Sequence, residues 1–171
     1  GADALVASGK AQFGVSFQDS MAPGVAGDNA LPNTAVAALI QHNTSGIISR
    51  KGEGMERPKG LEGKKYATWD APIEKAMMQN VVEKDGGDFS KVELIPSTVT
   101  DEVSALKSKS VDAIWIFYAW AGVATEVANL ETDYFAFADI DPVFDFYTPV
   151  VIANNDFLAQ NPDTAKAFLA A

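Results

Sequence analysis

The chain has 171 residues, a formal net charge of −10 at pH 7 and no cysteine. The acidic balance repels phosphate backbones and anionic lipid headgroups, so we expect no nucleic-acid partner and no direct membrane partner. Without cysteine the chain cannot form a disulfide, a zinc–thiolate site or an iron–sulfur cluster, and we expect neither a metal nor a cofactor.

Helix and strand patterns alternate along the chain, which favours an α/β fold. The first part carries, in chain order, a helix end at residues 2–8, a strand at 13–17, a short helix capped by Asp19 or Ser20, and strands at 34–41, 46–49 and 65–68. The second part carries a helix from Asp70, a strand at 92–95, a helix capped by Thr100, a strand at 113–118, a helix at 122–130, strands at 134–138 and 150–153, and one or two helices at 156–169.

The helix that begins at Asp70 has the clearest signals. Asp70 can cap its first turn, and Pro72 occupies a position where a missing N–H is harmless. Ile73, Met77 and Val81 follow at helical spacing and form one apolar face. We therefore expect this helix to pack one face against a sheet.

The chain also shows a weak internal similarity. Residues 4–15 and residues 105–115 each read as a helix end, a turn of small residues and a buried strand. The similarity suggests two α/β lobes built alike, although a common helix–turn–strand connection would give the same pattern. The segment 51–65, which is rich in Gly and Lys and contains Pro58, is predicted to connect the lobes.

Several segments resemble the type 2 periplasmic-binding-protein fold. The resemblance is carried by residues 14–19 (GVSFQD), 41–46 (QHNTSG), 61–70 (LEGKKYATWD), 103–106 with 111–113, and the late segments 156–158, 161–162 and 167–169. More narrowly, these segments resemble the thiamine-pyrimidine, nitrate, taurine and alkanesulfonate binding proteins of ABC importers. The resemblance covers nearly the whole chain, in order.

The resemblance implies two lobes joined by two crossovers, with a ligand in the cleft between them. The first lobe would comprise residues 1–52, the second lobe residues 53–140, and the return to the first lobe residues 141–171, with the first lobe incomplete. Closure around a small-molecule ligand would be sensed by an ABC transporter permease. The protein would then be extracytoplasmic, and it would meet the membrane only through the transporter or a lipid anchor.

The loops at 16–20, 41–45, 68–73 and 118–122 are expected to line that cleft. A flat heterocycle needs aromatic faces for stacking and side-chain amides or carboxylates for hydrogen bonds. The stacking candidates are Trp69, Tyr118, Trp120 and Tyr147, and the polar candidates are Gln18, Asp19, His42, Asn43 and Glu74. Each has a plainer alternative: Asp19 can be a helix cap, Glu74 can complement a helix dipole, and Tyr118 and Trp120 can equally be core residues. Trp115 and Phe117 are predicted to be core.

We expect a binding protein and not an enzyme. The preferred ligand is an aminopyrimidine precursor of thiamine, and the alternatives are a riboflavin-like heterocycle, a sulfonate or nitrate. Scarce Lys and Arg near the predicted cleft disfavour an anion. Fungal thiamine-pyrimidine synthases share the fold but use a histidine, a lysine-bound pyridoxal phosphate and a cysteine-rich iron site, and this chain has no cysteine. A ligand-binding regulatory domain is a further alternative.

Overall fold

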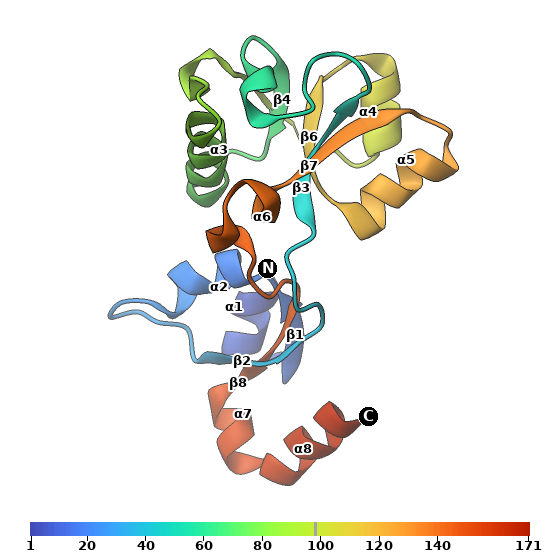
Figure 1. The fold of residues 1–171 in the computed structure, drawn as a ribbon. Coiled ribbons are helices and arrows are strands. Elements are labelled where there is room, and N and C mark those ends of the chain that lie inside the picture. Colours follow the sequence, from blue (N-terminus) through green and yellow to red (C-terminus); the bar gives the residue numbers. More distant parts are fainter. Residues whose placement is uncertain (98) are drawn as a thin grey trace. The chain divides into compact units, whose positions relative to one another are not determined.

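The computed structural model describes residues 1–97 and 99–171, which form two compact units (Figure 1). Unit 1 comprises Gly1–Asn43 and Phe146–Ala171, and unit 2 comprises Thr44–Asp145. The strands are β1 (Phe13–Ser16), β2 (Asn33–Ala38), β3 (Ser45–Arg50), β4 (Lys65–Thr68), β5 (Glu93–Pro96), β6 (Ala113–Phe117), β7 (Thr132–Ala136) and β8 (Val150–Asn154). Helices and strands alternate, so the predicted α/β class is confirmed.

The helices are mostly short. The α-helices are α1 (Ala2–Ala7), α2 (Gln18–Val25), α3 (Pro72–Lys84), α4 (Glu102–Ser108), α5 (Val123–Val127), α6 (Phe137–Ile140), α7 (Asn155–Gln160) and α8 (Pro162–Ala170). Short 3₁₀ turns occur at η1 (Pro58–Leu61), η2 (Phe89–Lys91) and η4 (Pro142–Phe144), and a π-helical turn occurs at η3 (Tyr118–Gly122). Among the described residues, none of these helices has both the length and the apolar character needed to cross a membrane.

Unit 1 is built on a three-stranded antiparallel sheet in the order β1-β8-β2. Alternate residues of β8, Val150 and Ile152, pack against Val6 of α1 and Met21 of α2. On the other face, Phe13 of β1 stacks on Phe168 of α8, with ring centroids 4.0 Å apart. The sheet is therefore covered by helices on both faces.

Unit 2 is built on a five-stranded mixed sheet in the order β5-β4-β6-β3-β7. β4 pairs in parallel with β5 and β6, whereas β3 pairs antiparallel with β6 and β7. Figure 1 shows α3 on one face of this sheet and α4 and α5 on the other. Ile48, Ile114 and Ile116 pack with Leu106 of α4 in one core cluster. All six residues of β3 are buried, because the strand lies inside the sheet and helices cover both faces of the sheet (Figure 1).

The lobe boundaries were predicted after residues 52 and 140, whereas the units meet after Asn43 and after Asp145. β3 was placed in the first lobe by prediction, yet it pairs with β6 and β7 within unit 2. The segment 51–65, predicted to connect the lobes, also lies inside unit 2, where Met55 and Leu61 are fully buried. Apolar side chains in a glycine-rich stretch thus contribute to the core of unit 2.

Three predicted helix caps are wrong for local reasons. α2 begins at Gln18 with Phe17 before it, so Asp19 lies within the first turn. α4 is capped by Asp101, whose carboxylate accepts the Ser104 N–H, and not by Thr100. Asp70 takes a left-handed conformation with φ of 65°, and α3 starts after Ala71.

Candidate functional site

Two adjoining hollows lie at the carboxyl ends of β4 and β5 in unit 2. The first has a volume of about 310 Å³ and is lined by Thr68, Trp69, Asp70, Pro96 and Ser97. The second, of about 140 Å³, is lined by Ala67, Trp69, Ser97, Val99, Glu102, Ile114 and Trp115. In α/β proteins, ligands bind outside the carboxyl ends of parallel strands. We call these two hollows together the Trp69 site.

Trp69 is the residue on which the site is centred. Its side chain is 49% exposed, and its ring meets Trp115 edge to face, with centroids 5.0 Å apart. Trp115 in turn packs at 4.3 Å against Phe137, which is fully buried. This row of three rings fixes one side of the Trp69 indole and leaves the rest available to stack on a flat ligand.

The turn that carries Trp69 is tied to a buried carboxylate. Glu74 is fully buried, and its Oε1 accepts the Tyr66 hydroxyl at 2.6 Å. Its Oε2 accepts the Thr68 hydroxyl at 2.9 Å and the Ala71 N–H at 3.3 Å. Burial, followed by the hydrogen bond to Glu74, raises the pKa of the Tyr66 phenol far above its ordinary value. Glu74 was predicted to contact a ligand, but its carboxylate lies in the interior of unit 2 and binds groups of that unit.

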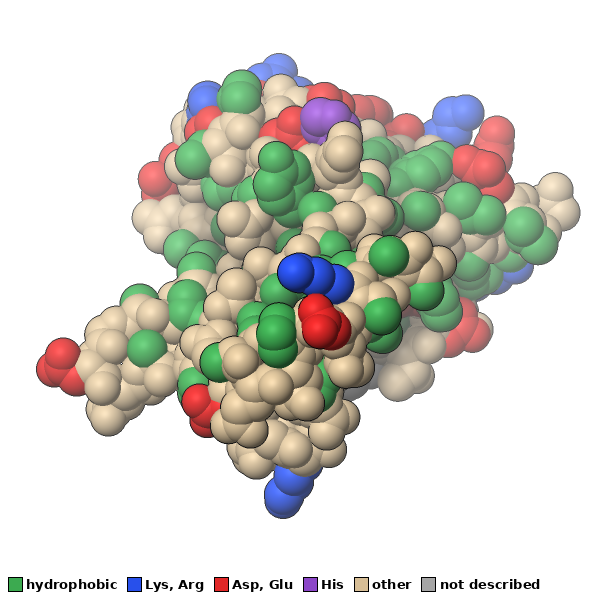
Figure 2. Space-filling view, turned by 90° about the horizontal axis from the view of Figure 1, so that it is seen from below, with side chains coloured by type: hydrophobic (Ala, Val, Ile, Leu, Met, Phe, Trp, Pro, Cys, Tyr) green, Lys and Arg blue, Asp and Glu red, His purple; other side chains and the backbone are tan. Residues whose placement is uncertain are grey.

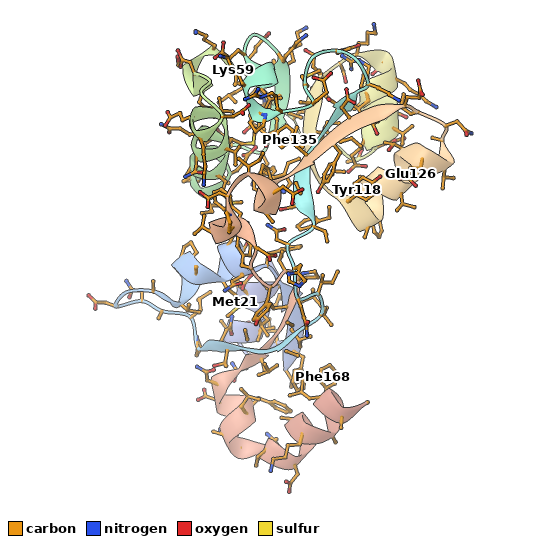
Figure 3. All side chains as sticks on the ribbon, in the orientation of Figure 1. Met21, Lys59, Tyr118, Glu126, Phe135 and Phe168 are labelled. Carbon is orange, nitrogen blue, oxygen red and sulfur yellow. The ribbon has the colours of Figure 1, made fainter. Side chains whose placement is uncertain are left out.

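Two predicted aromatic residues follow β6 in the π-helical turn η3. Figure 3 shows Tyr118 beside Glu126 of α5, and the Tyr118 hydroxyl donates to the Glu126 carboxylate. This hydrogen bond raises the pKa of Tyr118. Trp120 is 80% exposed. π-Helical turns are often found at functional sites, and this turn presents Trp120 to solvent while Tyr118 is held against its own unit.

Five predicted site residues lie in unit 1. Gln18 and Asp19 form the first turn of α2, where Gln18 is exposed and Asp19 is partly buried. His42 is exposed and Asn43 is buried, at the end of the first segment of the unit. Tyr147 is 55% exposed in the returning segment. Contact of these residues with a ligand remains a prediction.

The sequence model of the NMT1/THI5-like family matches residues 1–171. The chain belongs to the NMT1/THI5-like family. Binding proteins of Brucella abortus and Brucella suis are each 28% identical to it over 142 residues, which are 82% of this chain and 44% of theirs. The chain thus spans less than half the length of these curated relatives.

Solved structures show the same fold in this NMT1/THI5-like chain. The periplasmic sulfonate-binding protein SsuA of Methylobacillus flagellatus is 24% identical with a TM-score of 0.65, over 96% of this chain and 48% of that one. The aliphatic sulphonate binding protein SsuA of Escherichia coli is 15% identical with a TM-score of 0.71, over 98% of this chain and 52% of that one. The desulfurization enzyme DszB is 12% identical with a TM-score of 0.60, over 90% and 58%. The predicted resemblance to type 2 periplasmic binding proteins is confirmed.

Among the residues that line the Trp69 site of this family member, the sequence-based prediction did not name Asp70, Ser97, Glu102 or Trp115 as ligand contacts. Ser97 follows β5 and borders both hollows, and Glu102 in the first turn of α4 lines the second. Trp115 was predicted to be core, and it is partly exposed and lines the second hollow. The only signal for Ser97 was its place directly after a strand that ends in Pro96. Within residues 1–97 and 99–171, no cluster of three or more His, Asp or Glu side chains is placed to hold a metal ion.

Proposed function

We propose that the protein is the extracytoplasmic solute-binding component of an ABC importer, and that it captures a small flat heterocycle such as an aminopyrimidine. The observation that carries this proposal is the Trp69 indole, half-exposed and held by Trp115 beside a hollow with polar edges. Stacking on Trp69 would bind the face of the ring. The hydroxyl of Ser97 and the carboxylates of Asp70 and Glu102 would accept hydrogen bonds from its exocyclic amines.

The charges around the site support a neutral or amine-bearing ligand over an anion. Asp70 and Glu102 are the charged residues among those that line the two hollows, and Asp70 pairs with Lys75. A helix N-terminus usually favours an anion. Here the Ala71 N–H at the start of α3 already donates to the buried Glu74 carboxylate. A sulfonate would therefore meet the carboxylates of Asp70 and Glu102 and a helix N-terminus that already holds the Glu74 carboxylate.

Family membership and the relatives support the transport role. The Brucella relatives are described as binding proteins, and two of the solved neighbours are sulfonate-binding proteins described as periplasmic. The partner would be the permease of the importer, and the protein would meet the membrane only through it or through a lipid anchor. The likeness to DszB keeps an enzymatic reaction as an outcome of the test.

A thermal-unfolding screen tests the proposal. The panel contains hydroxymethyl and formylamino aminopyrimidines, thiamine, riboflavin, taurine, an alkanesulfonate and nitrate. A ligand that binds only the folded protein at a hundredfold excess over Kd stabilises it by about 2.7 kcal/mol. We expect a rise in Tm with an aminopyrimidine, and we expect the Trp69→Ala variant to lose it while keeping nearly the wild-type Tm.

A matched control is Phe168→Ala, because Phe168 in unit 1 is 50% exposed and so resembles Trp69 in exposure. This variant should keep the ligand-induced rise in Tm. A rise with the alkanesulfonate alone would contradict the proposed ligand class. Conversion of a bound compound into a new product, followed by mass spectrometry, would replace the binding-protein proposal with an enzymatic one.

A further inference from the structure

We infer that Glu74 is a positioning residue for ligand binding: from its buried place on α3 it sets the conformation of the Thr68–Ala71 turn and thereby the placement of the Trp69 ring. The inference rests on the proposed function, because it assumes that Trp69 stacks on the ligand. Glu74 itself is fully buried, so it offers no surface to a ligand.

The carboxylate fixes the direction of a relay of hydrogen bonds. The Thr68 hydroxyl donates its single proton to Glu74 Oε2. The Thr68 oxygen is then left with lone pairs, and it accepts the Asp70 N–H at 2.9 Å. The Ala71 N–H is held directly by the same Oε2. Two successive backbone N–H groups of the turn thus depend on one buried carboxylate.

The backbone of the turn needs such support. Asp70 adopts φ of 65°, a left-handed conformation that residues other than glycine rarely take. Asp70 also pairs with Lys75, but both side chains are exposed, and exposed ion pairs contribute little. The two ties to Glu74 are therefore the main restraints on this conformation. Trp69 lies between Thr68 and Asp70, so the direction of its side chain follows from the restrained turn.

Methionine cannot take the place of Glu74 in this arrangement. Three donors converge on the two carboxylate oxygens: the Tyr66 hydroxyl, the Thr68 hydroxyl and the Ala71 N–H. A methionine side chain is of similar length but offers no oxygen acceptor. The side chain would keep most of its volume, whereas both ties to the turn, which end on Oε2, would be lost.

The test compares Glu74→Met with Glu83→Met on the same helix. Glu83 is exposed and bonded only to Gln79 among the hydrogen bonds found for its side chain in the described residues. Two quantities are measured in each variant: the Kd for hydroxymethyl aminopyrimidine, and the fluorine NMR spectrum of protein labelled with fluorotryptophan. The sequence has three tryptophans, and the Trp69 resonance is identified by its loss in Trp69→Phe.

We expect Glu74→Met to weaken binding about tenfold and to shift or broaden the Trp69 resonance, because a lost buried hydrogen bond is worth about one factor of ten. Glu83→Met should leave both quantities unchanged. If Glu74→Met fails to fold, Thr68→Val removes the relay to Asp70 with nearly the same side-chain shape, and it should act in the same direction.

A lower Tm in Glu74→Met with an unchanged Kd and an unchanged Trp69 resonance would overturn the inference, because Glu74 would then serve stability alone. The NMR measurement needs no ligand, so it separates the two proposals. If the wild-type protein binds no aminopyrimidine, the proposed ligand class fails. The Trp69 resonance then supports the positioning of Trp69 by Glu74 if it moves, and overturns it if it does not.

Discussion

The two units differ in how completely the strands of their β-sheets are buried. In unit 2, β3 lies between β6 and β7 and is buried along its whole length. In unit 1, the central strand β8 is mostly buried, but β1 and β2 are sheet edges with exposed residues such as Val15. Although unit 1 is the smaller unit, it carries most of the exposed large apolar side chains among the described residues.

The difference indicates where the stability of the chain lies. Unit 2 has fewer exposed large apolar residues than unit 1 although it is the larger unit, and most of the buried core residues belong to it. It therefore supplies the rigid support that a binding site requires. Leu5, Val15 and Leu39 of unit 1 are more than half exposed. Figure 2 shows hydrophobic side chains reaching the surface at many points on the face it displays. We expect local opening of unit 1 to need less free energy than opening of unit 2.

The comparison between the units can be tested by substitution, and the largest loss of unfolding free energy is expected at Phe137. This ring is fully buried in unit 2 and packs against Trp115, Phe135 and Phe144. Phe137→Ala should lower the free energy of unfolding by about 3–5 kcal/mol, because it leaves a cavity in a packed core. Phe168→Ala in unit 1 should lower it by about 1 kcal/mol, mainly through the lost stacking on Phe13. Urea unfolding followed by circular dichroism measures both, and equal losses would remove the distinction between the units.

Within unit 2, sequence-based prediction succeeded for elements with a local pattern and failed where side chains of other elements determine the conformation. The strand predicted at 113–118 is β6, because its apolar run is uninterrupted and it lies inside the sheet. α3 begins at Pro72 as its sequence signals predict, yet the role of Asp70 was wrong. We infer that Glu74 sets the conformation of Asp70 through the Thr68 hydroxyl. The place of Glu74 in the first turn of α3 gave no sign that its carboxylate also binds Thr68 and Tyr66 of β4.

The candidate site was also only partly predictable from the sequence. Trp69 was predicted as a stacking residue from its place after a strand. Ser97 and Glu102 were missed because they approach Trp69 only through the parallel pairing of β4 with β5 and the return of the chain into α4. Strand order in a sheet is a long-range property, so loops that meet at one edge cannot be recognised from their own residues.

A second prediction concerns two arginine–aspartate pairs of unit 2. Arg50 is buried, bonds to Glu53 and Asp112, and donates to the carbonyl oxygens of Leu106 and Val111 at 3.0 and 2.8 Å. Arg50→Met should lower the free energy of unfolding by about 2 kcal/mol, because buried acceptors lose their donor. Arg57 pairs with Asp85 at the surface, with 65% of its side chain exposed. Arg57→Met should cost less than about 1 kcal/mol.

The pH dependence sharpens this second prediction. Burial opposes ionisation of Asp112, but hydrogen bonds from the Lys65 N–H and from Arg50 outweigh it and lower the pKa of Asp112. A carboxylate with a lowered pKa stabilises the folded state above its ordinary pKa of about 4, and this contribution is lost as pH falls through the folded-state value. In Arg50→Met the burial remains without the cation, so the loss of unfolding free energy should begin at higher pH. An unchanged acid profile would show that Arg50 does not hold Asp112 ionised.

The smallest effect on stability is expected at Trp120, whose side chain is 80% exposed in η3. Trp120→Ala should change the free energy of unfolding by no more than about 0.5 kcal/mol, as for other surface substitutions. Val127 of α5 is the matched control, because it is 78% exposed on the same helical segment. If Trp120 stacks on the ligand as predicted, calorimetric titration with hydroxymethyl aminopyrimidine should give a weaker Kd for Trp120→Ala and an unchanged Kd for Val127→Ala. Unchanged binding in both variants would confine ligand stacking in unit 2 to the Trp69 site, because Tyr118 is held by Glu126.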